Sequence, residues 1–246
     1  MDRMLYLSMA AAKNTMQAQT INSHNLANAS TPGFRADLAR FITMPVDGIG
    51  FQTRVYADQQ PTDVNFQAGP VQQTGNPLDV AIEGEGFIGI ILPDGSEGYT
   101  RAGNLRINSS GMLETGGGFP VLGNGGPIVI PPAQQIEIGT DGTISIRPVG
   151  QDERTLATVN RIKLVNPDVT SLQKSVDGQL RLKDGTVAPP DASVRVTSGV
   201  LESSNVNMVE SLVEMIALAR QFEANVKAIQ TAKENDESAA QMLRIS

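Results

Sequence analysis

The stretch Asn25-Leu-Ala-Asn-Ala-Ser-Thr-Pro-Gly-Phe34, followed by Arg35, decides how the fold is divided. Pro32 disfavours helical geometry at Thr31, the residue before it, and a Pro-Gly pair suits the two central positions of a type II turn. The apolar side chain of Phe34 can anchor the extended segment that leaves the turn. The stretch therefore predicts the end of an N-terminal helix and a sharp change of chain direction.

The segment before this turn, roughly residues 2–28, contains no glycine and no proline and is rich in helix formers. Leu5, Met9, Ala12 and Met16 recur at steps of four, three and four, which places them on one helix face. An apolar stripe this narrow cannot offset the entropy of ordering the segment alone. We therefore expect a helix that forms only when it packs against another element.

The last segment, roughly residues 205–244, has the same character. Its apolar positions recur at steps of three and four: Val209, Leu212, Ile216, Ala219, Phe222, Val226 and Ile229. A helix of about 39 residues would be about 58 Å long. Because this exceeds the usual helix of a compact domain, the pattern favours a coiled coil or a bundle.

The middle of the chain, roughly residues 36–202, indicates strands and tight turns. Residues that favour strands cluster or alternate at 136–138, 144–146, 161–165, 180–182 and 194–196. Between such runs lie four Asp-Gly pairs, at 94–95, 141–142, 177–178 and 184–185, and each is a strong signal for a tight turn. We therefore expect an antiparallel β-domain inserted between two helices that the chain ends supply.

This pattern predicts an α+β fold with four segments. They are an N-terminal helical arm at 1–35, an extended connector at 36–77, the antiparallel β-domain at 78–202 and a C-terminal helical arm at 203–246. Neither arm is amphipathic enough to stand alone, so the two must pair with each other or with other molecules.

Composition narrows the classes of function. The 246 residues carry a net charge of −7, no Trp and no Lys/Arg run, which disfavours nucleic-acid binding and adhesion to anionic lipid. With no Cys and a single histidine, His24, the chain cannot build a thiolate zinc site or a two-histidine metal site. We predict no catalytic residues, no cofactor and no metal.

The chain start lacks the pattern of a cleaved signal peptide, and no apolar run of about 20 residues is long enough to span a bilayer. These rules alone predict a cytoplasmic protein. That prediction fails if export uses a route without a cleaved signal.

Three stretches of the chain carry a family resemblance. The first is the stretch Asn25–Phe34, with Asn25, Leu26, Ala27, Asn28, Thr31, Pro32, Gly33 and Phe34 as its motif residues. The second is Thr74-Gly-Asn-Pro-Leu-Asp-Val-Ala-Ile-Glu-Gly-Glu-Gly-Phe87, which continues through Tyr99-Thr-Arg-Ala-Gly-Asn104 to Pro131. The third is Ser198-Gly-Val-Leu-Glu-Ser-Ser-Asn-Val-Asn207, at the start of the C-terminal arm. In this order the three stretches resemble the flagellar basal-body rod protein family.

The resemblance implies a structural subunit that stacks helically into the hollow drive shaft of the bacterial flagellum. The terminal helices would pair as a coiled-coil or bundle domain in the inner tube wall, with the β-domains outside. The partners would be copies of the chain, other rod proteins and, in transit to the periplasm, the flagellar type III export apparatus. No nucleic acid and no direct membrane insertion is implied. The chain start and end are most similar to proximal rod members of the family, with a distal rod member as the alternative.

The helical stripes and the resemblance together nominate an assembly interface. Its residues are Leu5, Met9, Met16, Leu26, Val209, Leu212, Ile216, Phe222, Val226 and Ile229.

Two functions of other classes remain as alternatives. A hydrolase acting on the cell wall would show turnover by the purified protein that disappears when one carboxylate is changed. A secreted adhesin or wall-binding β-module would bind as an isolated monomer without its helical ends.

Overall fold

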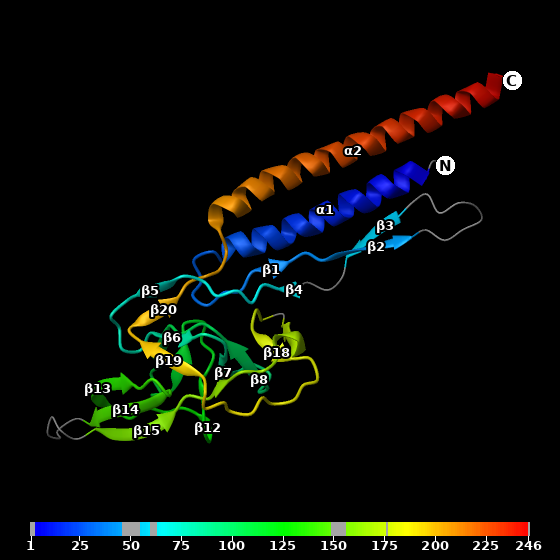
Figure 1. The fold of residues 1–246 in the computed structure, drawn as a ribbon. Coiled ribbons are helices and arrows are strands. Elements are labelled where there is room, and N and C mark those ends of the chain that lie inside the picture. The colour runs from blue at the N-terminus through cyan, green and yellow to red at the C-terminus, as the bar shows by residue number, and fades with distance from the viewer. Residues whose placement is uncertain (1–2, 46–54, 60–62, 149–155, 176, 246) are drawn as a thin grey trace. The chain divides into compact units, whose positions relative to one another are not determined.

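The computed structural model describes residues 3–45, 55–59, 63–148, 156–175 and 177–245 (Figure 1). The chain forms two compact units. Unit 1 contains residues 1–29, 37–65 and 206–246, and unit 2 contains residues 30–36 and 66–205. Across the described residues, no helix is both long enough and apolar enough to cross a membrane. The four-segment division expected from the sequence stays a prediction.

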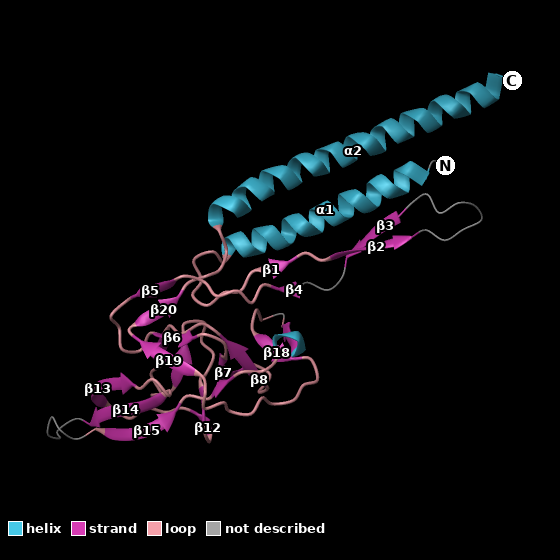
Figure 2. Cartoon of the chain, viewed as in Figure 1, coloured by secondary structure: helices cyan, strands magenta, loops and turns pink. Residues whose placement is uncertain are grey.

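Unit 1 is built around the two helices of the chain ends, α1 (Arg3–Ala27) and α2 (Met208–Ile245), which lie against each other (Figure 2). Two antiparallel strand pairs complete the unit: β1 (Asp37–Leu38) with β4 (Asp63–Val64), and β2 (Phe41–Pro45) with β3 (Val55–Gln59). The side chain of Asn207 accepts hydrogen bonds from the backbone N–H groups of Val209 and Glu210, at 3.1 and 3.4 Å. Asn207 therefore caps the start of α2.

The prediction that the terminal helices pair as a coiled-coil or bundle tube-wall domain is wrong. The described residues contain just two α-helices, of 25 and 38 residues, and the rest of the regular structure is antiparallel strand. A coiled coil needs a continuous apolar seam. Several buried positions of these helices are instead small or polar: Ser8, Ala12, Thr15 and Asn22 on α1, and Ser211 and Ala232 on α2.

Unit 2 is an antiparallel β-domain. Its largest sheet has the strand order β16-β7-β8-β18-β17, and a three-stranded sheet has the order β13-β14-β15. Two-stranded pairs join β5 with β20, β6 with β19, β9 with β10 and β11 with β12.

The strand bounds in unit 2 are β5 Val71–Gln73, β6 Val80–Glu83, β7 Phe87–Ile91, β8 Glu97–Thr100, β9 Leu105–Ile107, β10 Leu113–Thr115, β11 Leu122–Gly123, β12 Gly126–Pro127, β13 Ala133–Ile138, β14 Thr143–Pro148, β15 Ala157–Arg161, β16 Leu164–Val165, β17 Leu172–Lys174, β18 Leu180–Leu182, β19 Arg195–Ser198 and β20 Val200–Glu202. A short 3₁₀ helix, η1 (Val169–Ser171), precedes β17.

The predicted turns are confirmed. Gly95, Gly142, Gly178 and Gly185 all have positive φ, between 70° and 81°. The N–H of each donates to the carbonyl three residues earlier, which closes the turn. Three of these turns join neighbouring antiparallel strands of the β-domain, as the Asp-Gly pairs indicate.

The main hydrophobic core lies in unit 2. Its fully buried members include Val80, Ile88, Ile90, Leu113, Val121, Ile128 and Ile144. Burying one large apolar side chain contributes roughly 1.5–3 kcal/mol. The β-domain therefore has a hydrophobic core of its own that stabilises it. In unit 1, by contrast, many large apolar side chains are exposed.

Candidate functional site

Unit 1 exposes an unusual amount of apolar surface. Fourteen of the nineteen exposed large apolar side chains in the described part of the chain belong to it. They are Met4, Tyr6, Met9 and Met16 on α1, Leu38, Phe41 and Ile42 on β1 and β2, and Met208, Val209, Leu212, Val213, Ile216, Val226 and Met242 on α2. We call these fourteen side chains the apolar surface of unit 1. Val209, Leu212, Val213 and Ile216 are three or four positions apart along α2, and an exposed apolar stripe of this kind is typical of a protein interface.

The ten residues predicted as an assembly interface divide into two groups. Met9, Met16, Val209, Leu212, Ile216 and Val226 belong to the apolar surface of unit 1, while Leu5, Leu26, Phe222 and Ile229 are half-buried. Leu212 and Ile216 are 46% and 56% exposed, so the contact between α1 and α2 leaves much of each side chain accessible. The stripe expected on α2 is therefore mostly available to another molecule.

The first motif stretch begins at the end of α1. The side-chain amide of Asn25 both donates to the backbone carbonyl of Asp37 and accepts from its N–H, at 2.8 Å in each case. His24 Nδ1 lies 2.7 Å from Asp37 Oδ2. Asn28 Nδ2 donates to the carbonyl of His24 at 2.9 Å, and this carbonyl also accepts from the backbone N–H of Asn28 at 3.2 Å. Leu26 is half-buried and Ala27 is exposed.

The same motif continues into unit 2 as a turn packed tightly against β-domain backbone. Gly33 has a φ of 67°, and a Cβ at this position would lie 2.2 Å from the carbonyl carbon of Arg101. Its N–H donates to the carbonyl of Glu202 at 2.8 Å. The ammonium of Lys174 lies 4.0 Å from the ring centroid of Phe34 and donates to the carbonyl of Arg35 at 2.9 Å. The backbone of Arg101, the carbonyl of Glu202 and the side chain of Lys174 therefore all contact the turn.

Three charged residues, each within or directly after one of the three motif stretches, meet in a buried cluster. Arg35 Nη1 lies 2.6 Å from Glu202 Oε1, and Arg101 Nη1 lies 3.1 Å from Glu202 Oε2. The three side chains are 4%, 6% and 2% exposed, respectively. We call Arg35, Arg101 and Glu202 the ion cluster. Because these residues are far apart in sequence, their meeting was not predicted. The signal available in the sequence was a charged residue within or directly after each motif.

Arg101 makes further contacts within the β-domain. Its Nη2 donates to the carbonyl of Gly84 at 2.6 Å, and its guanidinium lies 5.3 Å from the ring centroid of Phe87. The Phe87 ring is edge-on to Phe66, at 6.3 Å between centroids. Burial lowers the pKa of Arg101, while the carboxylate of Glu202 opposes that shift.

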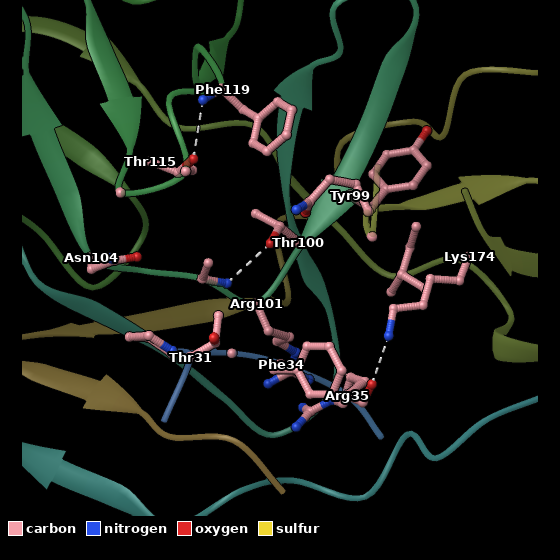
Figure 3. Close-up of a pocket in the computed structure, with 18 of the residues that line it drawn as sticks. Thr31, Phe34, Arg35, Tyr99, Thr100, Arg101, Asn104, Thr115, Phe119 and Lys174 are labelled. Carbon is pink, nitrogen blue, oxygen red and sulfur yellow. Dashed lines mark hydrogen bonds between the residues drawn. The ribbon is translucent and has the colours of Figure 1, made fainter. Parts of the chain in front are cut away.

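A pocket of about 360 Å³ lies beside the ion cluster within unit 2 (Figure 3). Thr31, Phe34 and Arg35 of the first motif line it, together with residues 99–102, Asn104, Thr115 and Phe119. Several of its polar groups already have partners: Thr115 accepts from the N–H of Phe119 and Thr100 accepts from that of Ala102, at 3.3 and 3.2 Å. Both hydrogen bonds are local to the β-domain and fix the backbone that lines the pocket.

The carboxylates whose pKa values are shifted belong to turns. The pKa of Asp94 is lowered to about 2, chiefly by hydrogen bonds from the Ser96 hydroxyl and backbone N–H. The pKa values of Asp141, Asp168, Asp184 and Asp191 are also lowered, in each case by hydrogen bonds from a residue two positions later. Within the described ranges, no three His, Cys, Asp or Glu side chains are placed to hold a metal ion.

Comparisons with known proteins found two matching family models and relatives that align over the whole chain. Residues 81–146 match the family model "Flagellar hook protein FlgE/F/G D1 domain", and residues 197–242 match "Flagellar basal body rod FlgEFG protein C-terminal". The chain is 42% identical to the flagellar basal-body rod protein FlgF of Salmonella typhimurium and 41% identical to that of Escherichia coli. Both alignments cover 100% of each chain. It is 32% identical to the rod protein FlgG of Bacillus subtilis, over 94% of this chain and 96% of the relative.

Proposed function

The chain belongs to the flagellar basal-body rod protein family and is a structural subunit of the rod, and we propose that it occupies the proximal, FlgF-type position. Full-length identity of 42% and 41% to two FlgF proteins supports this position over the FlgG type, for which the identity is 32%. The family is one of structural proteins, and the proposed function includes no catalysis.

The apolar surface of unit 1 is the observation that supports assembly through this unit. Six of its members, Met9, Met16, Val209, Leu212, Ile216 and Val226, together with the half-buried Leu5, Leu26, Phe222 and Ile229, form the proposed interface. Complete burial of a fully exposed side chain of this size contributes roughly 1.5–3 kcal/mol, and covering a partly exposed one contributes a corresponding fraction. Several such contacts per subunit outweigh the cost of ordering two molecules against each other.

The proposed partners are copies of this chain and the neighbouring rod proteins. A contact that joins two different surfaces of identical subunits does not close on itself, and repetition of that contact builds a helical assembly. We further propose that the subunit passes through the flagellar type III export apparatus without a cleaved signal and functions in the periplasm. The family resemblance supports both proposals.

A pair of substitutions tests the interface. Ile216→Asp and Val226→Asp place a carboxylate within the surface that assembly would bury, at a cost of several kcal/mol. Gln221→Asp is the matched control, because it adds the same charge at an exposed polar position of α2. We expect the two interface variants to be exported but absent from isolated basal bodies, with loss of swimming. Gln221→Asp is expected to assemble. Normal incorporation of Ile216→Asp would contradict the proposed interface.

A cross-linking map tests the proximal position. Single reactive residues placed at exposed sites of α2 would be cross-linked in isolated basal bodies, and the neighbours identified by mass spectrometry. Neighbours from the proximal rod would support the FlgF-type position. Cross-links confined to distal-rod and hook proteins would instead assign the chain to the FlgG type.

A further inference from the structure

The chain passes between the two units four times, and each time it enters or leaves one of three segments of unit 2. The passages occur after residues 29, 36, 65 and 205, so the segments concerned are 30–36, 66–70 and 201–205. We call them the exit segments. The exit segments therefore connect unit 2 to all three parts of unit 1, which are the N-terminal part, residues 37–65 and the C-terminal part.

Backbone hydrogen bonds hold the exit segments to one another. Gly33 N–H donates to the carbonyl of Glu202 at 2.8 Å, and Asn205 N–H donates to that of Phe34 at 3.3 Å. Ser203 N–H donates to the carbonyl of Pro70 at 2.8 Å. Segment 201–205 therefore lies between the other two.

The side chain of Asn205 adds a second connection between all three. Its Oδ1 accepts from Ala36 N–H at 2.8 Å, and its Nδ2 donates to the carbonyl of Gln67 at 2.9 Å. The backbones of segments 66–70 and 201–205 also approach each other closely, because a Cβ on Gly69 would lie 2.1 Å from the carbonyl oxygen of Ser203.

The carboxylate of Glu202 contacts two of the exit segments and the β-domain. One carboxylate oxygen accepts from Gly69 N–H at 2.9 Å and lies 2.6 Å from Arg35 Nη1. The other oxygen pairs with Arg101, which is anchored in the β-domain through Gly84. Glu202 thus contacts the first and second exit segments and the β-domain at once, while lying on the third.

We propose that Glu202 is a positioning residue for assembly: its carboxylate holds the three exit segments together within unit 2, so that these segments keep one fixed arrangement in every subunit. This inference rests on the proposed function as a rod subunit. The lock depends on charge as well as shape, because removing the carboxylate leaves two buried guanidinium groups without the anion that both contact.

Amide hydrogen exchange on the purified full-length chain tests the lock. Glu202→Gln keeps the size of the side chain and removes its charge. We expect the amides of Gly33, Gly69 and Asn205 to exchange about tenfold faster, or more, relative to the core amides of Gly89 and Leu113. Equal acceleration of all five amides, or unchanged protection of the first three, would overturn the proposal.

Two further variants provide the control and a segment-specific readout. Glu97→Gln breaks the ion pair with Lys163, 2.8 Å apart and partly buried, elsewhere in unit 2, and is expected to leave the exit segments protected. Arg35→Gln leaves the pair Arg101–Glu202 intact and should fold even if Glu202→Gln does not. It is expected to accelerate exchange at Gly33 while Gly69 stays protected. Unchanged exchange at Gly33, or acceleration at both glycines, would contradict the proposed geometry.

An assembly experiment completes the test. In cells, the Glu202→Gln subunit is expected to be exported and recovered folded, but to be incorporated into basal bodies at a tenth of the wild-type level or less, about the effect of 1.4 kcal/mol. Glu202→Asp, which retains the charge, is expected to restore part of that incorporation. Wild-type incorporation of Glu202→Gln overturns the positioning role. Absence of the wild-type chain from basal bodies instead refutes the proposed function, and the exchange result stands separately.

Discussion

Asn22 on α1 donates a hydrogen bond from its side-chain amide to the backbone carbonyl of Ser211 in the first turn of α2, at 2.7 Å and in a buried position. The two residues are 189 positions apart in the sequence. A second hydrogen bond between the helices joins two side chains: Asn225 Nδ2 donates to Thr15 Oγ1 at 3.2 Å. Polar side chains therefore take part in the contact between the helices.

Asn22→Ala should weaken that contact. The substitution removes the donor to a buried carbonyl, at a cost of about 1–3 kcal/mol. We expect earlier loss of the far-ultraviolet helix signal on heating, with the β-domain transition unchanged. Thr20→Ala is the control, because Thr20 is exposed and bonds within its own helix, to Met16. An unchanged helix transition in Asn22→Ala would show that the bond contributes nothing.

Gly33→Ala should destabilise the β-domain more than an ordinary glycine substitution. Gly33 combines a φ of 67° with backbone only 2.2 Å from an added Cβ. Gly75 has a φ of 72° and nothing within 4 Å of its added Cβ, so Gly75→Ala reports the strain of positive φ alone. We expect about 1 kcal/mol for Gly75→Ala and at least about 2 kcal/mol more for Gly33→Ala, measured by urea unfolding. Similar losses in the two variants would argue against tight packing of the turn.

Glu202→Ala should be among the more damaging single changes in unit 2. Breaking a buried ion pair by removing one member typically costs about 3–5 kcal/mol. Glu137→Ala, at an exposed position of β13, is expected to stay within about 0.5 kcal/mol of wild type. Equilibrium unfolding of both variants at pH 7 compares the two sites directly. A loss below 1 kcal/mol for Glu202→Ala would mean that the domain relaxes around the missing charge.

The turn at Asp94 should respond to acid. Hydrogen bonds from Ser96 lower the pKa of this carboxyl from 3.8 to about 2, with a further contribution from Arg181. A group whose folded pKa is depressed contributes stability above its unfolded pKa, and that contribution is lost as pH falls from about 4 through 2. Ser96→Ala removes the hydroxyl donor, so the pKa of Asp94 should rise towards 3.8. Carboxyl chemical shifts in an NMR titration measure it, and an unshifted midpoint would contradict this assignment.

The local features were predictable because they depend on neighbours in the sequence. Absence of Gly and Pro with helical periodicity indicates both terminal helices, and the Asp-Gly pairs indicate turns that Gly95 and Gly142 confirm by positive φ. The Pro32-Gly33 turn was likewise expected from the preferences of its own residues. Each of these predictions rests on backbone geometry within a few residues.

The inward face of α2 was not predictable in the same way. The expected stripe contained Val209, Leu212 and Ile216, all of which the structure leaves exposed, while Ser211 is buried. An apolar stripe indicates which face can be covered, and a second molecule can cover it as well as α1 can. A buried polar position is compatible with folding only if a partner satisfies its hydrogen bonds, and periodicity does not reveal that partner.

The sequence by itself determined that both chain ends are helical, that a turn-rich β-domain separates them, and to which family the chain belongs. Tertiary structure alone decided which helix faces meet, and that Arg35, Arg101 and Glu202 form one buried cluster. The physical reason is the separation along the sequence of the residues that interact. Helix and turn preferences depend on residues a few positions apart. A buried charge is tolerated only where segments far apart in the sequence bring opposite charges together.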